Sequence, residues 1–144
     1  MSISDCQCPY LIVSLANEAL AQQSNKKGIY QLFEEINGKP SWKSGTQAIW
    51  YYPDFNQWMI GPLSSIGTSN RGITSTGNMH DCPLQVPKDK WKYYIKDGDG
   101  ERWQYANSND IIIECEGKNV KMYLVYCVKL YPGWNVDFLG PLCM

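Results

Sequence analysis

Turn signals divide much of this sequence into short runs of β-forming residues, and this spacing constrains the fold more than any other feature. Asn37-Gly38 is the dipeptide most typical of a two-residue hairpin turn. Pro53-Asp54, Gly61-Pro62 and residues 97–100 separate further runs of apolar and aromatic residues. Short strands with a turn about every ten residues are typical of an antiparallel sandwich or barrel. The sequence therefore predicts an all-β or mainly β protein.

Each run of high β propensity is a predicted strand. The expected strands cover residues 10–13, 29–36, 40–43, 47–52, 57–60, 91–95, 102–105, 110–115 and 120–130. Residues 14–23 have the composition of a helix, but the stretch is short enough to be a surface loop instead. Residues 63–87 are rich in Ser, Gly, Asn and Thr and are predicted to form a long loop, of the kind that tends to be functional or mobile.

The length of 144 residues indicates one domain, because two domains of about 70 residues would each be near the lower limit for an independent core. We expect a core module over residues 6–115 and a C-terminal extension over residues 116–144. The apolar fraction of 44% excludes a disordered chain.

The charge balance and the hydropathy pattern exclude two kinds of partner. The chain has 13 basic and 14 acidic residues, so it lacks the basic field that dominates affinity for nucleic acids. No stretch approaches the ~20 apolar residues of a membrane-spanning helix. Residues 1–5 do not have the pattern of a secretory signal, so an extracellular protein would contain this chain as a mature or partial form.

Six cysteines favour disulfides and an oxidising compartment. Zinc and buried thiols remain alternatives, although Cys6 and Cys8 are separated by one residue and not by the two to four of common zinc sites. Sequence cannot choose among the fifteen pairings of six cysteines. We expect Cys82 and Cys115 to be bonded, since both lie at the edges of strand-like segments.

Motifs for catalysis are weak in this chain. His80 and Cys82 lie two residues apart, but a Cys–His nucleophile needs the pair in contact with a third, orienting group. Glu34 or Glu35 with Asp54 could form a carboxylate pair of the glycosidase type, but a chance pair is common among 14 acidic residues. We therefore predict that the protein is not an enzyme and has no cofactor or metal site.

The aromatic residues provide the one direct argument for function. The chain has 10 Tyr and 6 Trp but only 3 Phe. Trp58, Trp91 and Trp103 lie among apolar strand residues and are expected in the core. Adjacent aromatics at residues 50–52 and 93–94 must alternate between the two faces of a strand, so some rings point outward or are covered by loops. The expected ligand-binding residues are Trp50, Tyr51, Tyr52, Tyr93, Tyr94, Asn70 and Arg71.

The order of several motifs resembles a known kind of module. The motifs are a strand led by a cysteine (8–13), GIY (28–30), NGKPSW (37–42), IWYY (49–52), WMIG (58–61), CP (82–83), WKY (91–93), Trp103 and IIIEC (111–115). In this order they resemble a small Trp-rich, Cys-containing β-module that recurs in secreted and receptor-type proteins of invertebrates. The resemblance covers about residues 6–115 and lies in the ordered set; Cys127 and Cys143 extend beyond the usual final cysteine. It implies an extracellular module that binds or displays and does not catalyse.

Three hypotheses for function follow. The first is a non-enzymatic, extracellular binding module that recognises a glycan or a protein surface through exposed Tyr and Trp and the Ser/Gly/Asn-rich loop. The second is a structural module that forms a homo-oligomer, with the strand at residues 120–130 pairing with another copy. The third is a small hydrolase that uses carboxylates or Cys82.

Overall fold

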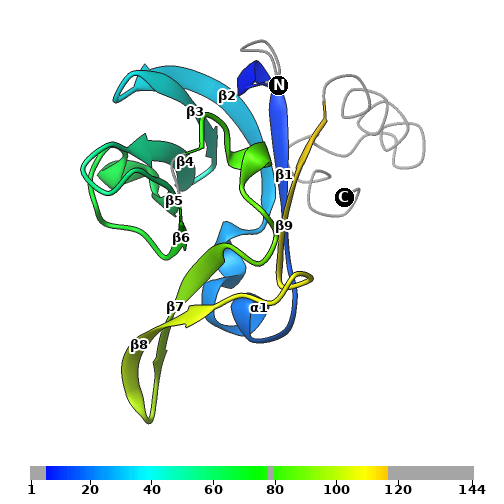
Figure 1. Ribbon diagram of the computed structural model, residues 1–144, viewed down its shortest axis with the longest axis vertical. Coiled ribbons are helices and arrows are strands. Elements are labelled where there is room, and N and C mark those ends of the chain that lie inside the picture. The colour runs from blue at the N-terminus through cyan, green and yellow to red at the C-terminus, as the bar shows by residue number, and fades with distance from the viewer. Residues whose placement is uncertain (1–5, 78–79, 117–144) are drawn as a thin grey trace, which may run out of the picture.

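The computed structural model describes residues 6–77 and 80–116, which form one curled antiparallel sheet and one short α-helix (Figure 1). The strands are β1 (Tyr10–Leu15), β2 (Gly28–Ile36), β3 (Lys39–Ser44), β4 (Gln47–Tyr52), β5 (Gln57–Pro62), β6 (Ile73–Ser75), β7 (Trp91–Asp97), β8 (Gly100–Tyr105) and β9 (Ile111–Cys115). The helix is α1 (Asn17–Gln23), and the 3-10 turns are η2 (Ser24–Lys26), η3 (Leu63–Ser65) and η4 (Pro83–Gln85). The prediction of a mainly β protein with at most one short helix is confirmed.

The strands follow one another across the sheet in the order β8-β7-β6-β5-β4-β3-β2-β1-β9. Each strand from β1 to β8 is therefore next to its neighbour in sequence, and only β9 returns across the molecule to pair with β1. The sheet curls into an incomplete barrel rather than two stacked layers, with β8 and β9 as its two edges (Figure 1).

The predicted hairpin turn at Asn37-Gly38 is confirmed. Asn37 has φ 56° and Gly38 has φ 84°, so both residues occupy the left-handed region that a type I′ turn requires. The turn joins β2 to β3, and it fixes the pairing of Ile36 with Lys39. The left-handed conformation explains why Asn and Gly stand at these two positions.

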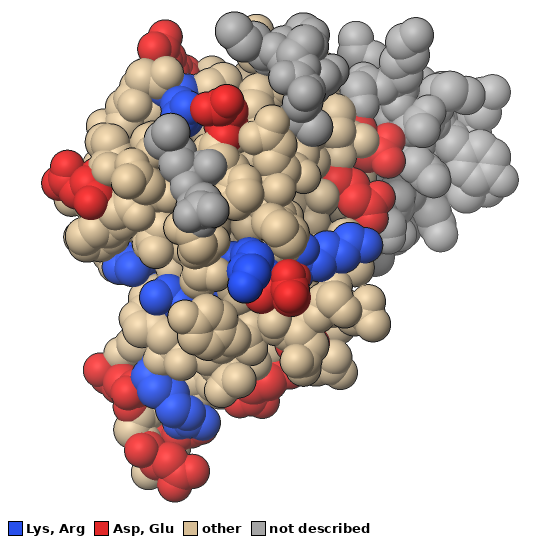
Figure 2. Space-filling model, in the orientation of Figure 1, with Lys and Arg blue, Asp and Glu red and all other residues tan. Residues whose placement is uncertain are grey.

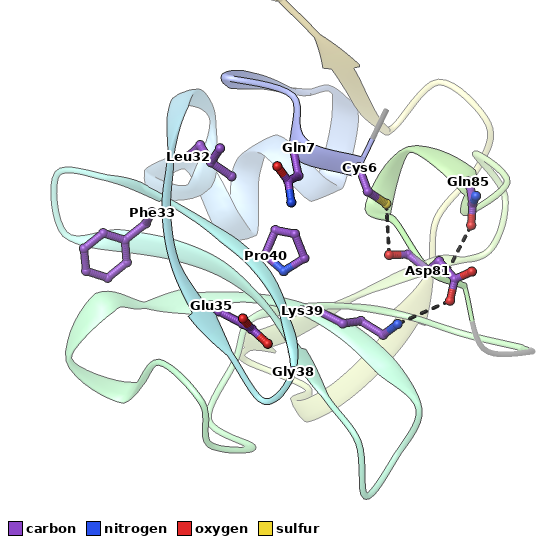
Figure 3. A pocket seen from close by; sticks show the side chains of 10 residues that line it. All are labelled: Cys6, Gln7, Leu32, Phe33, Glu35, Gly38, Lys39, Pro40, Asp81 and Gln85. Atoms are coloured by element: carbon purple, nitrogen blue, oxygen red, sulfur yellow. Dashed lines mark hydrogen bonds and ion pairs between the residues drawn. The ribbon is translucent and has the colours of Figure 1, made fainter. Parts of the chain in front are cut away.

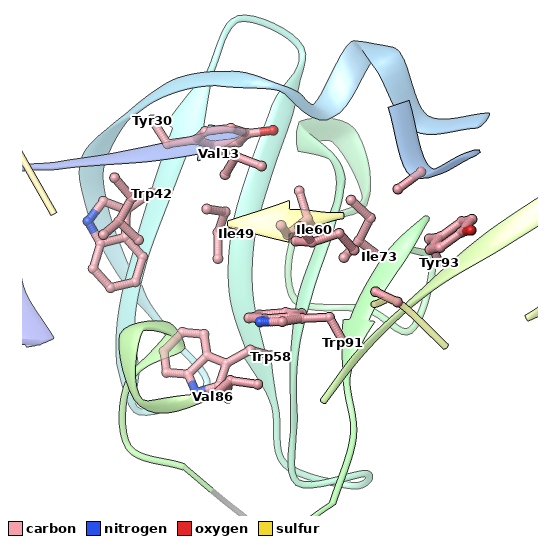
Figure 4. Close-up of a cluster of buried hydrophobic side chains, with 14 of the residues drawn as sticks. Val13, Tyr30, Trp42, Ile49, Trp58, Ile60, Ile73, Val86, Trp91 and Tyr93 are labelled. Carbon is pink, nitrogen blue, oxygen red and sulfur yellow. The ribbon is translucent and has the colours of Figure 1, made fainter. Parts of the chain in front are cut away.

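The main core lies against one face of the sheet and contains most of the large rings. Trp42, Trp58, Trp91 and Tyr30 are between 0% and 2% exposed and pack with branched aliphatic residues from neighbouring strands (Figure 4). A smaller cluster of Ala48, Trp50 and Met59 lies on the opposite face of β4 and β5. Both faces of these two strands are thus buried, which explains their nearly continuous apolar sequences.

Three buried indoles hold segments outside the strands. The bonds run from Trp42 Nε1 to Cys8 O (2.7 Å), from Trp50 Nε1 to Thr68 O (2.9 Å) and from Trp58 Nε1 to His80 O (2.8 Å). Phe would fill similar space but has no N–H to donate, so these contacts account for part of the excess of Trp over Phe. The core and the long loops are therefore joined by specific hydrogen bonds.

The disulfide differs from the predicted one. Cys115 is bonded to Cys8, with a Cα–Cα distance of 5.8 Å, so the predicted bond between Cys82 and Cys115 is wrong. The reason is topological: β9 pairs with β1 in a register that places Cys115 opposite Leu11, close to the N-terminal end of β1. Cys82 lies instead at the start of η4, beside Cys6.

Two further predictions concern the remainder of the chain. The strand expected at residues 120–130, together with Cys127 and Cys143, lies outside the described residues. The long loop expected at residues 63–87 contains a short strand, β6, that the sequence pattern did not indicate. Among the residues that the structure describes, no helix is long and apolar enough to cross a membrane.

Candidate functional site

The β7–β8 hairpin sorts its aromatic residues onto two faces. Trp91 and Tyr93 point into the main core and are 2% and 3% exposed. Their neighbours Lys92 and Tyr94 lie on the other face, because side chains alternate along a strand. Tyr94 is paired with Trp103 on β8, and the two ring centroids are 5.4 Å apart. The hairpin therefore presents a tilted pair of partly exposed rings.

The end of β8 adds a further ring to this face. Tyr105 is the cross-strand partner of Lys92 and is 63% exposed. It is one of only two large hydrophobic side chains counted as exposed among the described residues. The other is Phe55, at 49%, in the turn between β4 and β5. The Phe55 ring meets the Tyr52 ring edge to face at 5.0 Å between centroids.

Arg71 lies between these two groups of rings. Its guanidinium carbon is 4.7 Å from the centroid of Trp103 and 5.5 Å from that of Phe55. The backbone before it passes directly over Gly61, where an added Cβ would be 2.7 Å from Asn70 O and 2.8 Å from Arg71 Cα. A glycine on β5 is therefore required for the loop to approach the sheet and place the guanidinium among the rings.

We call this region the aromatic–cationic surface. It consists of Tyr52, Phe55, Arg71, Lys92, Tyr94, Trp103 and Tyr105. Its members come from the β4–β5 turn, the loop before β6 and the β7–β8 hairpin. The curl of the sheet and the loop over Gly61 bring these separate segments together.

The two cations of this surface, Arg71 and Lys92, contact the same ring. Lys92 Nζ is 5.4 Å from the centroid of Trp103, so Trp103 contacts both Lys92 and Arg71. No carboxylate of the described residues forms an ion pair with either cation. Burial lowers the pKa of Arg71, and burial together with the positive charge of Arg71 lowers the pKa of Lys92. The two positive charges thus repel each other across a partly desolvated site.

The hydrogen bonds of Arg71 are incomplete within the described part of the chain. Its Nη1 donates to Ser69 O at 3.0 Å. Its Nε is buried and has no acceptor among those residues. A guanidinium has five N–H donors arranged to bind an oxyanion through two parallel bonds. Arg71 is therefore held in place by rings while it retains capacity for an anionic group.

At the tip of the same hairpin, by contrast, the basic side chains are paired with carboxylates. Arg102 donates to both carboxylate oxygens of Asp97, at 3.1 and 3.2 Å. Lys96 Nζ is 3.6 Å from a carboxylate oxygen of Glu101. Acidic and basic groups accordingly lie together on the projecting hairpin in Figure 2. The cations at the tip are neutralised, and those of the aromatic–cationic surface are not.

Comparison with known proteins gives no identification. No family model, curated protein or solved structure matches this chain. The site is therefore interpreted from its own chemistry, which consists of an unneutralised pair of cations and several amphipathic rings.

The predicted ligand-binding aromatics divide into two groups. Trp50, Tyr51 and Tyr93 are 0%, 4% and 3% exposed and therefore do not contribute to an exposed surface. Trp50 does point away from the main core, but the loop around Thr68 covers it. Tyr52 and Tyr94 are partly exposed and belong to the aromatic–cationic surface.

The other predicted residues also separate. Arg71 lies within the surface, whereas Asn70 is exposed beside it and donates from Nδ2 to Ser65 Oγ at 2.8 Å. Trp103 was expected in the core, and that prediction is wrong because it faces outward opposite Tyr94. Trp103 and Phe55 were both missed as surface residues. The pairing of Trp103 with Tyr94 across residues 97–100 could have revealed the first of them.

The cysteine of the hydrolase hypothesis lies in the protein interior. Cys82 is fully buried and its thiol contacts that of Cys6. Burial and the contact with Cys82 raise the pKa of Cys6 to about 12, which is the reverse of an activated thiol. Within the described part of the chain, no three His, Cys, Asp or Glu side chains are grouped so as to bind a metal ion.

Proposed function

We propose that this protein is a non-enzymatic, extracellular binding module whose aromatic–cationic surface recognises an acidic glycan. The acidic group is a carboxylate or a sulfate, and it binds to Arg71 and Lys92. The neighbouring rings pack against the faces of the sugar.

The observation that carries this proposal is the position of Arg71 and Lys92 on the same Trp103 ring, with no carboxylate of residues 6–77 or 80–116 paired to either cation. Two cations held close together repel each other, and an anion placed between them removes that repulsion. The fold holds the two cations together, and cation–π contacts of about 0.5–2 kcal/mol each offset part of their repulsion. The surface is thus prepared for negative charge before any ligand arrives.

The surrounding rings favour a sugar as the bearer of the charge. Trp103, Tyr94 and Tyr105 carry indole or hydroxyl groups, and such rings combine apolar contact with hydrogen bonding at low entropic cost. Phe55 adds exposed apolar ring surface. An acidic protein surface offers the same charge, and it is the alternative outcome of the experiment below.

The extracellular location is part of the same proposal. The bond between Cys8 and Cys115 is of a kind that persists in oxidising compartments. The resemblance to modules of secreted and receptor-type proteins supports the same location.

A glycan array tests the proposal when it includes neutral, sialylated and sulfated glycans with the same backbones. We expect binding to the acidic members only, and a loss of roughly 10- to 100-fold in affinity for Arg71→Gln, since a hydrogen bond to a charged group contributes about 1.5–3 kcal/mol. Trp103→Ala is expected to weaken binding to a similar degree. Binding should also weaken as salt is added.

Two matched variants serve as controls. Arg102→Gln removes a cation that Asp97 already neutralises. Phe33→Ala removes a partly exposed ring that contacts Lys43, outside the aromatic–cationic surface. Both are expected to bind like the wild type. Equal binding to neutral and acidic glycans, or unchanged binding by Arg71→Gln, would contradict the proposal, and binding to acidic proteins alone would replace the glycan with a protein partner.

A further inference from the structure

A second pair of cysteines lies close to the disulfide. Cys6 is 6% exposed and Cys82 is fully buried, and the two side chains lie close enough for Cys82 to influence the titration of Cys6. The two residues are far apart in sequence, one before β1 and the other at the start of η4. The fold therefore brings two buried cysteine side chains close together.

Hydrogen bonds hold the segment around Cys82 on both sides. Trp58 Nε1 donates to His80 O at 2.8 Å, and the backbone N–H of Gln85 donates to Cys82 O at 3.0 Å. Lys39 Nζ forms an ion pair with Asp81 Oδ1 at 3.3 Å. Cys82 is thus fixed in a defined turn.

The segment around Cys6 is held against the same turn. Cys6 Sγ donates to Asp81 O at 3.0 Å, as Figure 3 shows beside the ion pair of Asp81 with Lys39. Cys8, two residues later, is fixed by its disulfide and by the indole of Trp42, which bonds to Cys8 O. Cys6 Sγ therefore lies against the carbonyl of the residue that precedes Cys82, and both cysteines belong to constrained segments.

We propose that Cys6 and Cys82 form a second disulfide when the protein folds in an oxidising environment. The oxidant is a small disulfide such as oxidised glutathione. A thiolate of one cysteine attacks it and forms a mixed disulfide with release of one glutathione thiol, and the other cysteine then displaces the second. The protein loses two protons and two electrons as its S–S bond forms, and the oxidant gains them as two thiols.

The burial of the pair determines when this reaction occurs. Burial, and then the contact with Cys82, raise the pKa of Cys6 to about 12, so its thiolate fraction at pH 8 is on the order of 10⁻⁴ in the folded protein. An ordinary cysteine has a pKa of about 8.5 and is roughly one-quarter thiolate at that pH. We therefore expect the bond to form faster during folding than after Cys6 is buried. Cys6 lines a cavity of about 500 Å³ and is itself 6% exposed, so a small oxidant has only limited access to it in the folded protein.

The test is disulfide mapping of the full chain. Reduced, unfolded protein is refolded with reduced and oxidised glutathione, treated with N-ethylmaleimide in denaturant and digested under acidic, non-reducing conditions. We expect Cys6 and Cys82 to be unmodified, with the peptide that contains Cys6 and Cys8 linked both to the peptide of Cys82 and to the peptide of Cys115. Fragmentation between Cys6 and Cys8 by tandem mass spectrometry then assigns each sulfur to its partner.

Two variants make the assignment independent of that fragmentation. Cys8→Ala/Cys115→Ala removes the first disulfide and should retain the link between Cys6 and Cys82. Cys6→Ala should make Cys82 reactive in denaturant and leave the first disulfide in place, with circular dichroism checking the fold of both variants. Maleimide on Cys6 or Cys82 of the refolded wild type, or a link from either to Cys127 or Cys143, would overturn the proposal. If neither variant folds, the wild-type map alone decides.

The order of reaction gives a second readout. Protein that is first refolded under reduction and only then exposed to oxidised glutathione should form this bond roughly 10- to 100-fold more slowly than an unstructured peptide carrying the same two cysteines, because the raised pKa lowers the thiolate fraction of Cys6 and only part of that loss is offset by the higher nucleophilicity of its thiolate. Equal rates would show that the pair is not enclosed as the structure indicates.

Discussion

Removal of the bond between Cys8 and Cys115 should destabilise the protein strongly, because the bond closes a very long loop. The two cysteines are 107 positions apart. In the chain-entropy model, a cross-link over about 100 residues restricts the unfolded chain by about 4.7 kcal/mol at 25 °C. A typical domain has a free energy of unfolding of only about 5–15 kcal/mol, so a third or more of the total depends on this bond.

Urea denaturation of Cys8→Ala/Cys115→Ala measures the effect, with Trp fluorescence reporting on the buried indoles. For a denaturant dependence of about 2 kcal/mol/M, a loss of 4–5 kcal/mol lowers the urea midpoint by roughly 2 M. Cys8 is 3% exposed, so part of any loss could come from the space left by its sulfur. The wild type under reducing conditions is the control, since it keeps both sulfurs and loses the bond. Because reduction also breaks the proposed bond between Cys6 and Cys82, the fall of the Cys6→Ala variant on reduction isolates the contribution of the first bond.

A fall of less than about 0.5 M in both samples would refute the reasoning. It would mean that the unfolded chain is already as restricted without the bond as with it. A large fall in the variant combined with a small fall in the reduced wild type would assign the effect to the missing sulfur of Cys8 and not to the cross-link.

Three further changes test the packing and the buried charge. Gly61→Ala should cost about 1–3 kcal/mol because the new Cβ meets backbone atoms at 2.7 and 2.8 Å, whereas Gly98→Ala, with no atom within 4 Å, should be close to neutral in urea denaturation. Trp58→Phe should cost about 1–3 kcal/mol, measured as a lower midpoint, because the carbonyl of His80 loses its indole donor. Burial lowers the pKa of Lys26 in the folded protein below its ordinary value of about 10.4. At a pH between these two pKa values, the unfolded chain binds more protons than the folded protein, so the free energy of unfolding rises with pH. Lys26→Met should therefore raise the urea midpoint at neutral pH and flatten its increase over the range just below the ordinary pKa of lysine, and an unchanged pH profile would refute the role of Lys26.

Local patterns were sufficient to predict most of the strands. The predicted run at residues 47–52 coincides with β4, and the Asn37-Gly38 turn has the predicted conformation. β6 escaped detection because its three residues lie among Ser, Gly and Thr, and its pairing with β5 and β7 determines it more than its own composition does. Tertiary pairing decides the structure of such a short segment.

The disulfide and the surface depended on contacts between distant segments. Cys8 is the partner of Cys115 only because β9 lies beside β1, and no local feature of either cysteine indicates that position. Alternation correctly predicted that adjacent aromatics face opposite ways, but it could not show that the loop at residues 63–72 covers Trp50 and leaves Tyr52 partly exposed. The polar composition of the loop that contains Arg71 predicts a role in binding. The position of Arg71 over the ring of Trp103 depends on contacts between distant segments.

The order of the strands also has a consequence for how the chain folds. Strands β1 to β8 pair with their neighbours in sequence, so each hairpin can form while only short loops are closed. The pairing of β9 with β1 is the exception, because it closes a loop of about 100 residues and carries a much larger entropic cost. Until β9 is in place, β1 is an open edge that can pair with another unfinished chain. The time that β1 spends uncovered therefore sets how strongly the yield of folded protein depends on protein concentration.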